Sequence, residues 1–276
     1  MGAPSLTCVS DLEREYSPSS RVGGSAEPFL AAYSARSAAV LADLGDRVER
    51  RAGGTLLARG APANDPAPLL VFVHGGYWQA LSAAASMYPA AGAVGAGWSY
   101  AAIEYTIAPA GNLRAMVAEC VAALADLGAC GPWREVVLAG HSAGAHLAAM
   151  VAVNATPPLV VDRLVLVSGI YDLRPLVHTT VNEPLGLDDA TAASLSPALL
   201  PLASPPSTMV AWGDQDTDAF RRQGLEFADR LDAAGLAVTG TEVAGRHHFD
   251  IVDDLVDRAT TLGAFALGRN GGGGTR

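Results

Sequence analysis

A strand-turn-helix pattern between Val136 and Ala149 constrains the fold of this chain more than any other feature. An apolar run rich in β-branched residues stops at Gly140, and an alanine-rich run that favours helix begins after Ser142. Gly140 and Gly144 flank the serine as Gly-x-Ser-x-Gly, which is typical of a strained turn that crowds a strand against a helix. The pattern predicts a nucleophile elbow that exposes Ser142 Oγ, the alternative being a glycine-rich turn with a hydrogen-bonding serine.

Composition favours one large α/β domain that acts on a small molecule. The chain has 276 residues, 50% of them hydrophobic and 17% charged, so it can bury an extensive core. Its net charge of -10 argues against nucleic acid and anionic membrane surfaces, because both would repel it. A small-molecule substrate is the expected partner; a homodimer is allowed, but the sequence sets no oligomeric state.

The cysteines and the N-terminal residues favour a cytoplasmic protein. Cys8, Cys120 and Cys130 are odd in number and lack C-x-x-C spacing, so neither a disulfide framework nor a metal site is expected. Residues 1–21 hold no apolar segment of a signal peptide. Residues 75–103 carry no charge, but their serines, glycines and proline are not typical of a membrane span.

Strands and helices alternate along the chain, which predicts a mostly parallel sheet with helices on both faces. A proline-rich segment between 171 and 207 interrupts this alternation and predicts a small inserted cap within a single domain spanning 1–269. Residues 1–26 are expected to form an irregular arm, and the glycine-rich 270–276 a disordered tail. Strands are predicted at 55–59, 69–73, 98–104, 136–140, 163–167, 209–212 and 237–243, and helices at 28–51, 113–127, 143–149, 220–234 and 251–267.

A serine nucleophile needs a base to remove its proton and a carboxylate to orient that base. In a parallel sheet, both are expected on loops at the carboxyl ends of later strands. Asp214 and Asp216 compete for the orienting role, and Asp216 is favoured because it lies further into its loop. Their spacing also suggests a calcium loop, but Ala219 and Leu225 stand where the EF-hand pattern needs Gly and Glu.

Two histidines follow these aspartates along the chain, and either could serve as the base. His248 is favoured because it adjoins Phe249 and the last predicted helix, whereas His247 is expected to point outward.

The loop 74–78, His-Gly-Gly-Tyr-Trp, follows a buried strand directly. Small residues there let backbone N–H groups face a developing oxyanion, so Gly76, Tyr77 and Ala143 are the predicted donors. The alternative is a tight turn beside a core tryptophan.

Four parts of the chain resemble the kynurenine formamidases (arylformamidases), relatives of the hormone-sensitive-lipase-like esterases within the α/β-hydrolase fold, and the resemblance covers nearly the whole chain. They are the loop 74–78 (H-G-G-x-W), the arm 15–19 (Y-S-P-S), the cap entry 169–176 with 181–182, and the segments 216–220 and 248–251. The resemblance implies a triad of Ser142, Asp216 and His248 with no metal or cofactor.

The same resemblance implies hydrolysis of N-formyl-L-kynurenine to L-kynurenine and formate through a formyl-enzyme. A formyl group needs almost no acyl pocket, whereas the aryl group needs an apolar cleft that Trp78, Tyr77, Tyr171 or Phe249 could line. For the amino-acid end, Arg174, Arg246 and Asn182 stay open as contacts. The alternatives are a short-acyl carboxylesterase with the same triad and a catalytically silent scaffold, which would require a missing triad member.

Overall fold

The computed structural model describes residues 9–63, 65–203 and 205–268. Cys8 and the predicted tail 270–276 lie outside these ranges. The described chain contains an eight-stranded sheet in the order β1-β2-β4-β3-β5-β6-β7-β8. Strands β1 and β2 pair antiparallel, as do β2 and β4, and the other neighbours are parallel. The strands are β1 (Val48–Arg50), β2 (Leu56–Ala58), β3 (Ala67–Val73), β4 (Ser99–Ile103), β5 (Trp133–His141), β6 (Arg163–Val167), β7 (Ser207–Gly213) and β8 (Val238–Val243).

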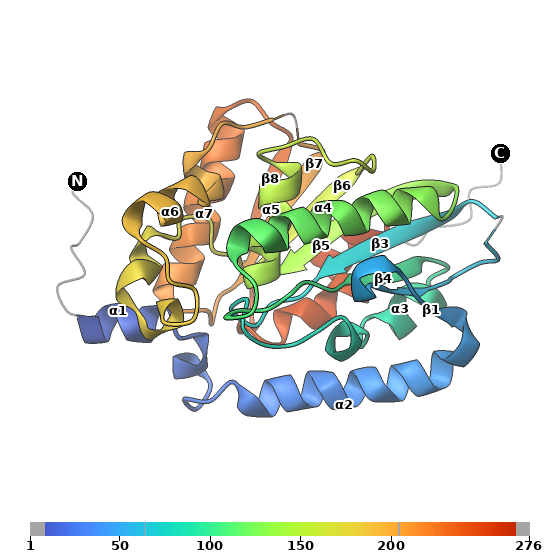
Figure 1. Cartoon of the computed structure of the whole chain (residues 1–276), viewed down its shortest axis with the longest axis horizontal. Helices are drawn as coiled ribbons and strands as arrows, with labels where there is room; N and C mark the ends of the chain where they lie inside the picture. Colours follow the sequence, from blue (N-terminus) through green and yellow to red (C-terminus); the bar gives the residue numbers. More distant parts are fainter. Residues whose placement is uncertain (1–8, 64, 204, 269–276) are drawn as a thin grey trace.

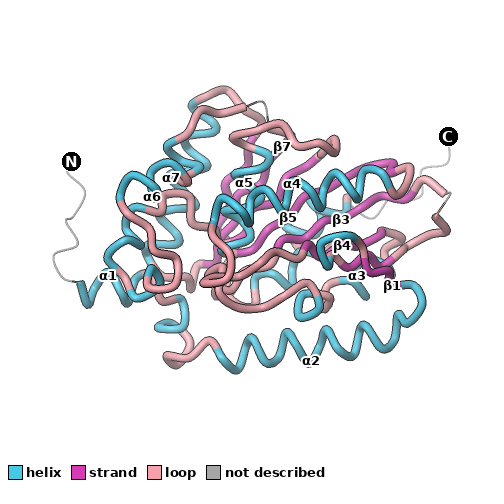
Figure 2. The backbone as a smooth tube through the Cα atoms, in the orientation of Figure 1, coloured by secondary structure: helices cyan, strands magenta, loops and turns pink. Residues whose placement is uncertain are grey.

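Helices lie on both faces of this sheet, so the expected three-layer α/β architecture is confirmed (Figures 1 and 2). The α-helices are α1 (Val9–Glu15), α2 (Glu27–Leu44), α3 (Ala90–Gly95), α4 (Leu113–Ala129), α5 (Ala143–Ala152), α6 (Asp189–Ser194), α7 (Asp218–Ala233) and α8 (Thr261–Leu267). Short 3₁₀ helices connect them: η1 (Pro18–Arg21), η2 (Gly45–Arg47), η3 (Ala52–Gly54), η4 (Ala84–Ser86), η5 (Arg174–His178), η6 (Thr180–Asn182), η7 (Pro197–Leu199) and η8 (Ile251–Val256).

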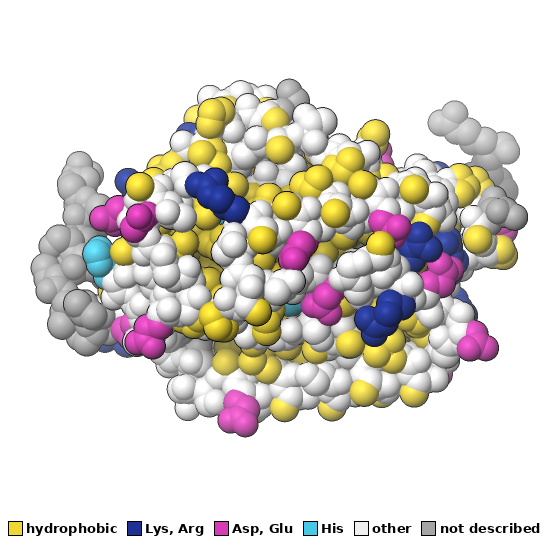
Figure 3. Space-filling model, viewed as in Figure 1, with side chains coloured by type: hydrophobic (Ala, Val, Ile, Leu, Met, Phe, Trp, Pro, Cys, Tyr) yellow, Lys and Arg dark blue, Asp and Glu magenta, His cyan; other side chains and the backbone are white. Residues whose placement is uncertain are grey.

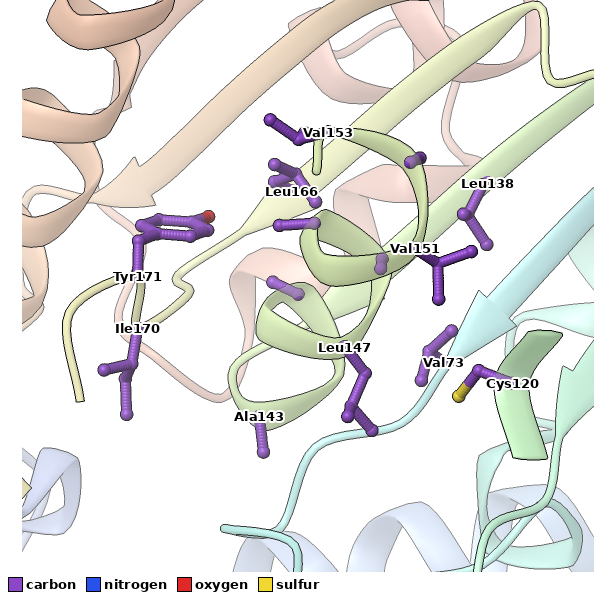
Figure 4. Packing of buried hydrophobic residues seen from close by; sticks show 14 of the residues in the cluster. Val73, Cys120, Leu138, Ala143, Leu147, Val151, Val153, Leu166, Ile170 and Tyr171 are labelled. Atoms are coloured by element: carbon purple, nitrogen blue, oxygen red, sulfur yellow. The ribbon is translucent and has the colours of Figure 1, made fainter. Parts of the chain in front are cut away.

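Strand β3 shows how a continuous apolar run builds two cores at once. Successive side chains of a strand point to opposite faces of the sheet. Leu69 and Val71 therefore pack in a cluster with α4, α5 and α7, whereas Leu70 and Phe72 pack in a second cluster with α2, α3 and α8. Figure 4 shows part of the first cluster around α5, where Leu147 and Val151 lie near Val73 and Leu138. Helix α5 is thus held in the core along most of its length.

Three predicted elements differ from the structure. The helix expected at 28–51 ends at Leu44, because Gly45 adopts a φ of 48° and the chain then enters β1. The closing helix expected at 251–267 is instead η8 followed by the separate helix α8. In the arm, residues 9–26 are not irregular, since α1 and η1 form within them.

The segment 171–207 contains η5, η6, α6 and η7, and its described residues, which omit position 204, form no strand before β7. Asn182 organises part of it: its Oδ1 accepts from Leu187 N at 2.7 Å and its Nδ2 donates to the Leu187 carbonyl at 2.8 Å. Short turns of this kind suit a segment that lies over the edge of a sheet rather than inside it.

Surface charge is distributed in small groups on the face shown in Figure 3, where basic side chains stand near acidic ones and form no continuous basic area among the described residues. None of the described helices has both the length and the hydropathy needed to cross a bilayer.

Candidate active site

The backbone at Ser142 has the strained geometry expected of an elbow. Its φ is 55° and its ψ is -119°, a region that residues with a side chain rarely occupy. Ser142 N donates to the Val167 carbonyl at 2.8 Å, which ties the turn to the neighbouring strand β6. A Cβ on Gly140 would lie 2.3 Å from the Gly144 carbonyl oxygen, and one on Gly144 would lie 2.0 Å from that of Val73. Only glycine therefore fits on either side of this serine.

His248 and Asp216 meet at the carboxyl ends of the strands. His248 Nδ1 lies 2.9 Å from Asp216 Oδ1, and both side chains are buried. A carboxylate only accepts, so Nδ1 carries the proton and donates it to this bond. The opposite ring nitrogen, Nε2, is thereby left as the basic atom, which is the tautomer that a general base requires.

Two further groups donate hydrogen bonds to Asp216, and neither of them was predicted from the sequence. Ser168 Oγ donates to its Oδ2 at 2.6 Å, and Gly213 N donates to the same oxygen at 3.2 Å. Burial by itself would raise the pKa of this carboxyl, but the charge and hydrogen bond of His248 and the bonds from Ser168 and Gly213 lower it overall. Asp214 instead accepts a bond from Gly245 N at 2.9 Å.

His141, next to the serine, holds the loop that carries His248. Its Nε2 donates to the His248 carbonyl oxygen at 2.8 Å, because that oxygen can only accept. Burial, followed by the charge of His248, lowers the pKa of His141 to about 3. The ring is therefore neutral at ordinary pH and acts as a fixed donor.

The loop after β3 lies directly against Ser142. A Cβ on Gly75 would lie 3.1 Å from Ser142 Cβ. Gly76, Tyr77 and Trp78 all have positive φ, at 93°, 52° and 59°. The N–H groups of Gly76 and Tyr77 donate to no group in the described chain. The N–H of Ala143, the first residue of α5, also has no acceptor among the described residues. The three predicted oxyanion donors thus keep their hydrogens available beside Ser142.

A cavity of about 240 Å³ opens over Ser142 and His248. Its walls come from the arm, from α2, from the loop after β3 and from the segment after η5. The lining residues are Glu13, Tyr16, Ser17, Pro18, Ser19, Ala26, Leu30, Tyr33, Gly76, Tyr77, Ala80, Leu81, His141, Ser142, Thr180, Val181, His248 and Phe249. Tyr77 and Phe249, predicted as apolar contacts for substrate, are among them.

Trp78 and Tyr171, the other two predicted contacts, do not line this cavity, and that prediction is wrong. Trp78 is fully buried and its ring meets His146 edge-on at 5.1 Å between centroids. Tyr171 is also fully buried, stacks on Phe227 at 4.1 Å, and is directed toward α5 in Figure 4. Both aromatics belong to the core because their backbones turn them away from the opening.

The residues left open for the amino-acid end of the substrate also lie elsewhere. Arg174 forms an ion pair with Asp172 at 2.7 Å, and Arg246 forms one with Asp254 at 2.6 Å. Both the oxygen and the nitrogen of the Asn182 side-chain amide form hydrogen bonds with backbone groups. None of the three lines the cavity.

The arm forms part of the site, a role that sequence patterns alone did not reveal. Glu15 Oε2 accepts from Ala219 N at 3.1 Å, and the Glu15 carbonyl accepts from Thr217 Oγ1 at 2.5 Å. The Tyr77 hydroxyl donates to the Tyr16 carbonyl, which joins the arm to the loop after β3. In the sequence, the Y-S-P-S segment was the one sign that the arm matters. It indicated a family resemblance but did not predict the contacts of the arm with Tyr77, Thr217 and Ala219.

Helix α2 contributes a second wall and also supports the His248 loop. The Tyr33 hydroxyl donates to the Phe249 carbonyl, and Phe29 stacks on the Phe249 ring at 4.5 Å between centroids. The loop that carries His248 is therefore fixed at two points, by His141 at the His248 carbonyl and by α2 at Phe249.

A larger cavity of about 600 Å³ is lined in part by Thr55, Glu104 and Glu119. Ser142, Asp216 and His248 are absent from its lining, whereas Ser142 and His248 line the smaller cavity. The described side chains include no group of three or more His, Cys, Asp or Glu suited to hold a metal ion.

The chain is similar to known hydrolases in sequence. Residues 70–250 match the family model described as an α/β hydrolase fold. Kynurenine formamidase of Danio rerio is 37% identical over 200 residues, covering 69% of this chain and 68% of the relative, and that of Drosophila melanogaster is 30% identical over 68% of each.

Solved structures show the same architecture. A Silicibacter sp. protein provisionally described as a thioesterase superposes with a TM-score of 0.80 at 26% identity, covering 92% of this chain and 98% of that one. An esterase of Pyrobaculum calidifontis gives a TM-score of 0.66 at 17% identity, covering 96% and 95%, which shows the shared fold. The elbow, the predicted fold and these relatives together show that the chain is a hydrolase of the α/β-hydrolase fold and belongs to the kynurenine formamidase family.

Proposed function

We propose that this hydrolase cleaves the formamide of N-formyl-L-kynurenine to L-kynurenine and formate, with Ser142 as nucleophile, His248 as base and Asp216 as its orienting acid. The observation that carries the proposal is the joint placement of Ser142 and the Asp216-bound His248 on one small cavity. At about 240 Å³ this cavity is below the ~300–1,000 Å³ usual for small-molecule sites, which favours a one-ring substrate with a minimal acyl group.

In the first half-reaction, Ser142 Oγ attacks the formyl carbon while His248 Nε2 takes the hydroxyl proton. The formyl oxygen gains the negative charge, and the N–H groups of Gly76, Tyr77 and Ala143 stabilise it. The intermediate collapses when the C–N bond breaks, and His248 returns the proton to the departing arylamine nitrogen. This step releases L-kynurenine and leaves a formyl ester on Ser142.

In the second half-reaction, water takes the place of the arylamine. His248 removes one proton from the water as its oxygen bonds to the formyl carbon, and the same donors hold the second oxyanion. The proton then passes to Ser142 Oγ as the ester bond breaks. Formate leaves and the free serine is restored, so each turnover consumes one water and no other reactant.

The test compares kcat/KM for N-formyl-L-kynurenine and p-nitrophenyl acetate, with Ser142→Ala as the blank, because specificity is defined by this ratio. We expect a preference for the formamide of about several hundredfold, lost in the variant. Equal or better turnover of the ester, with little formamide cleavage, would identify a short-acyl carboxylesterase instead.

A further inference from the structure

Among the described residues that line the cavity, the charged side chains include an acid but no Lys or Arg. Glu13 is the one acidic side chain of this described lining, and the other ionisable groups in it are two histidines and the tyrosines. His141 adds no positive charge, because burial lowers its pKa to about 3. A ligand in this cavity therefore meets a negative group on the arm side and no fixed cation.

Glu13 is held in place rather than free to turn outward. Thr180 N donates to its Oε2 at 3.0 Å, and Thr180 Oγ1 donates to its Oε1. These two donors occupy one acceptor position on each oxygen, and a carboxylate has about four. The remaining positions can accept from a ligand without breaking the contact between the arm and η6.

The carboxylate also lies close enough to influence the loop beside Ser142. The pKa of the Tyr77 phenol is raised well above its usual value, first by burial and then by the charges of Tyr16, Glu13 and Asp216. Tyr77 in turn donates to the Tyr16 carbonyl and lines the cavity. Glu13 thus stands at the wall of the same site, on the arm side of Tyr77.

We propose that Glu13 is a specificity-determining residue that binds the side-chain ammonium group of the substrate. The inference rests on the proposed function, which supplies an aryl formamide whose side chain carries both an ammonium and a carboxylate. The described lining of the cavity offers a charged partner for the first of these groups and no cationic partner for the second. The enzyme should therefore require the ammonium and tolerate loss of the carboxylate.

Three formamides separate these contributions: N-formyl-L-kynurenine, N-formylkynuramine, which keeps the ammonium without the carboxylate, and 2′-formamidopropiophenone, which lacks both. We expect the wild type to cleave the first two with similar kcat/KM and the third about 10- to 100-fold less well, the range of a hydrogen bond to a charged group. Glu13→Gln should remove most of that preference, because it lowers kcat/KM for the two ammonium compounds more than for the neutral formamide.

Two variants separate recognition from a structural role. Glu183 is exposed and lies outside the cavity lining, so Glu183→Gln changes the net charge equally and should keep the preference. Thr180→Val removes one donor to Glu13 but leaves its charge, and should also keep the preference for the ammonium compounds. If Glu13→Gln and Thr180→Val lower all three rates in parallel, Glu13 only fastens the arm and the proposal is wrong.

Failure of the proposed function can be told apart from failure of this inference. If the wild type cleaves none of the formamides, each is assayed as a competitive inhibitor of p-nitrophenyl acetate hydrolysis. Tighter inhibition by N-formylkynuramine than by 2′-formamidopropiophenone, lost in Glu13→Gln, would support ammonium binding in an enzyme of another substrate. Equal inhibition by the two compounds would overturn it.

Discussion

His141 Nε2 and the carbonyl oxygen of His248 are 2.8 Å apart, so the residue that precedes Ser142 fixes the backbone of His248. The two residues are 107 positions apart in the chain. This bond couples the position of the elbow to that of the imidazole, and their relative placement decides whether proton transfer can occur.

His141→Ala should therefore lower kcat/KM by about 10- to 100-fold, because a misplaced base loses proton-transfer geometry. Thermal unfolding of the same variant shows whether the fold has survived. His178→Ala is the matched control, since His178 is exposed and outside the cavity. Wild-type turnover in a folded His141→Ala protein would show that the bond has no part in positioning His248.

Ser168 should act on catalysis through Asp216. Ser168→Ala removes the 2.6 Å bond to Oδ2 of a buried carboxylate, and we expect kcat/KM to fall about 10-fold, as for the loss of one bond to a charged group. The pKa of Asp216 should rise in the variant, because a bond that favours its ionised form is gone. A pH profile of kcat/KM tests this: activity should begin to fall at a higher pH when the solution is acidified.

The matched control for that experiment is Ser196→Ala. Ser196 is also fully buried and accepts a bond from Leu173 N, but it lies away from Asp216. An unchanged acid limb in Ser168→Ala, or an equal displacement in Ser196→Ala, would argue against a specific effect.

Gly76 should tolerate no side chain. Its φ of 93° strains any other residue, and a Cβ would lie 2.5 Å from the Ala80 carbonyl oxygen. Gly76→Ala must move the loop that presents the N–H groups, so we expect kcat to drop by about 100- to 1,000-fold, the cost of losing one oxyanion donor.

Gly95→Ala serves as the comparison, because Gly95 ends α3 and a Cβ there meets nothing within 4 Å. That variant should be neutral or slightly more stable, by up to about 1 kcal/mol in free energy of unfolding. Normal kcat in Gly76→Ala would mean that the loop does not supply the donors.

Stability should rise with pH across the mildly acidic range. Burial lowers the pKa of His141 to about 3 and that of His146 to about 4, below the unfolded value near 6.5. Between these values the unfolded chain binds more protons than the folded one, so acid favours unfolding. We expect a loss of roughly 2–3 kcal/mol per histidine in the free energy of unfolding between about pH 7 and about pH 4.5.

His146→Gln should flatten this dependence, because it removes one of the two titrating groups and keeps an amide donor for the Leu195 carbonyl. Urea unfolding at several pH values gives the slopes. Identical slopes in the variant and the wild type would show that His146 is not buried as described.

The sequence predicted the sheet well and the ends of helices less well, for physical reasons. The run 69–73 is apolar at every position, which indicates a strand buried on both faces. By contrast, Gly45 was the local mark of the stop at Leu44, but residues 46–51 contain no proline and are mostly charged, which a helix also accepts, so the predicted helix ran past it. At 251–256 apolar spacing suggested an α-helix, yet Asp254 pairs with Arg246 and the segment takes the tighter 3₁₀ form.

The site shows the same division between local and distant information. The proximity of Asp216 and His248 followed from their order on loops after parallel strands. The contact of Glu13 with Thr180 joins residues 167 positions apart, and no periodicity marks such a pair. Trp78 was misplaced because an aromatic residue after a glycine loop can turn either way, and its positive φ directs it into the core.

The arm, the elbow and the His248 loop occupy the beginning, middle and later part of the described chain, and this order has a consequence during synthesis. A ribosome completes Ser142 well before it adds His248, and domains fold as their segments emerge. A nascent chain that extends past Ser142 but ends before residue 248 would contain the arm and the serine but would lack His248. Hydrolytic competence should therefore appear late, when the loop that carries His248 docks after β8, and partial translation products should be inert.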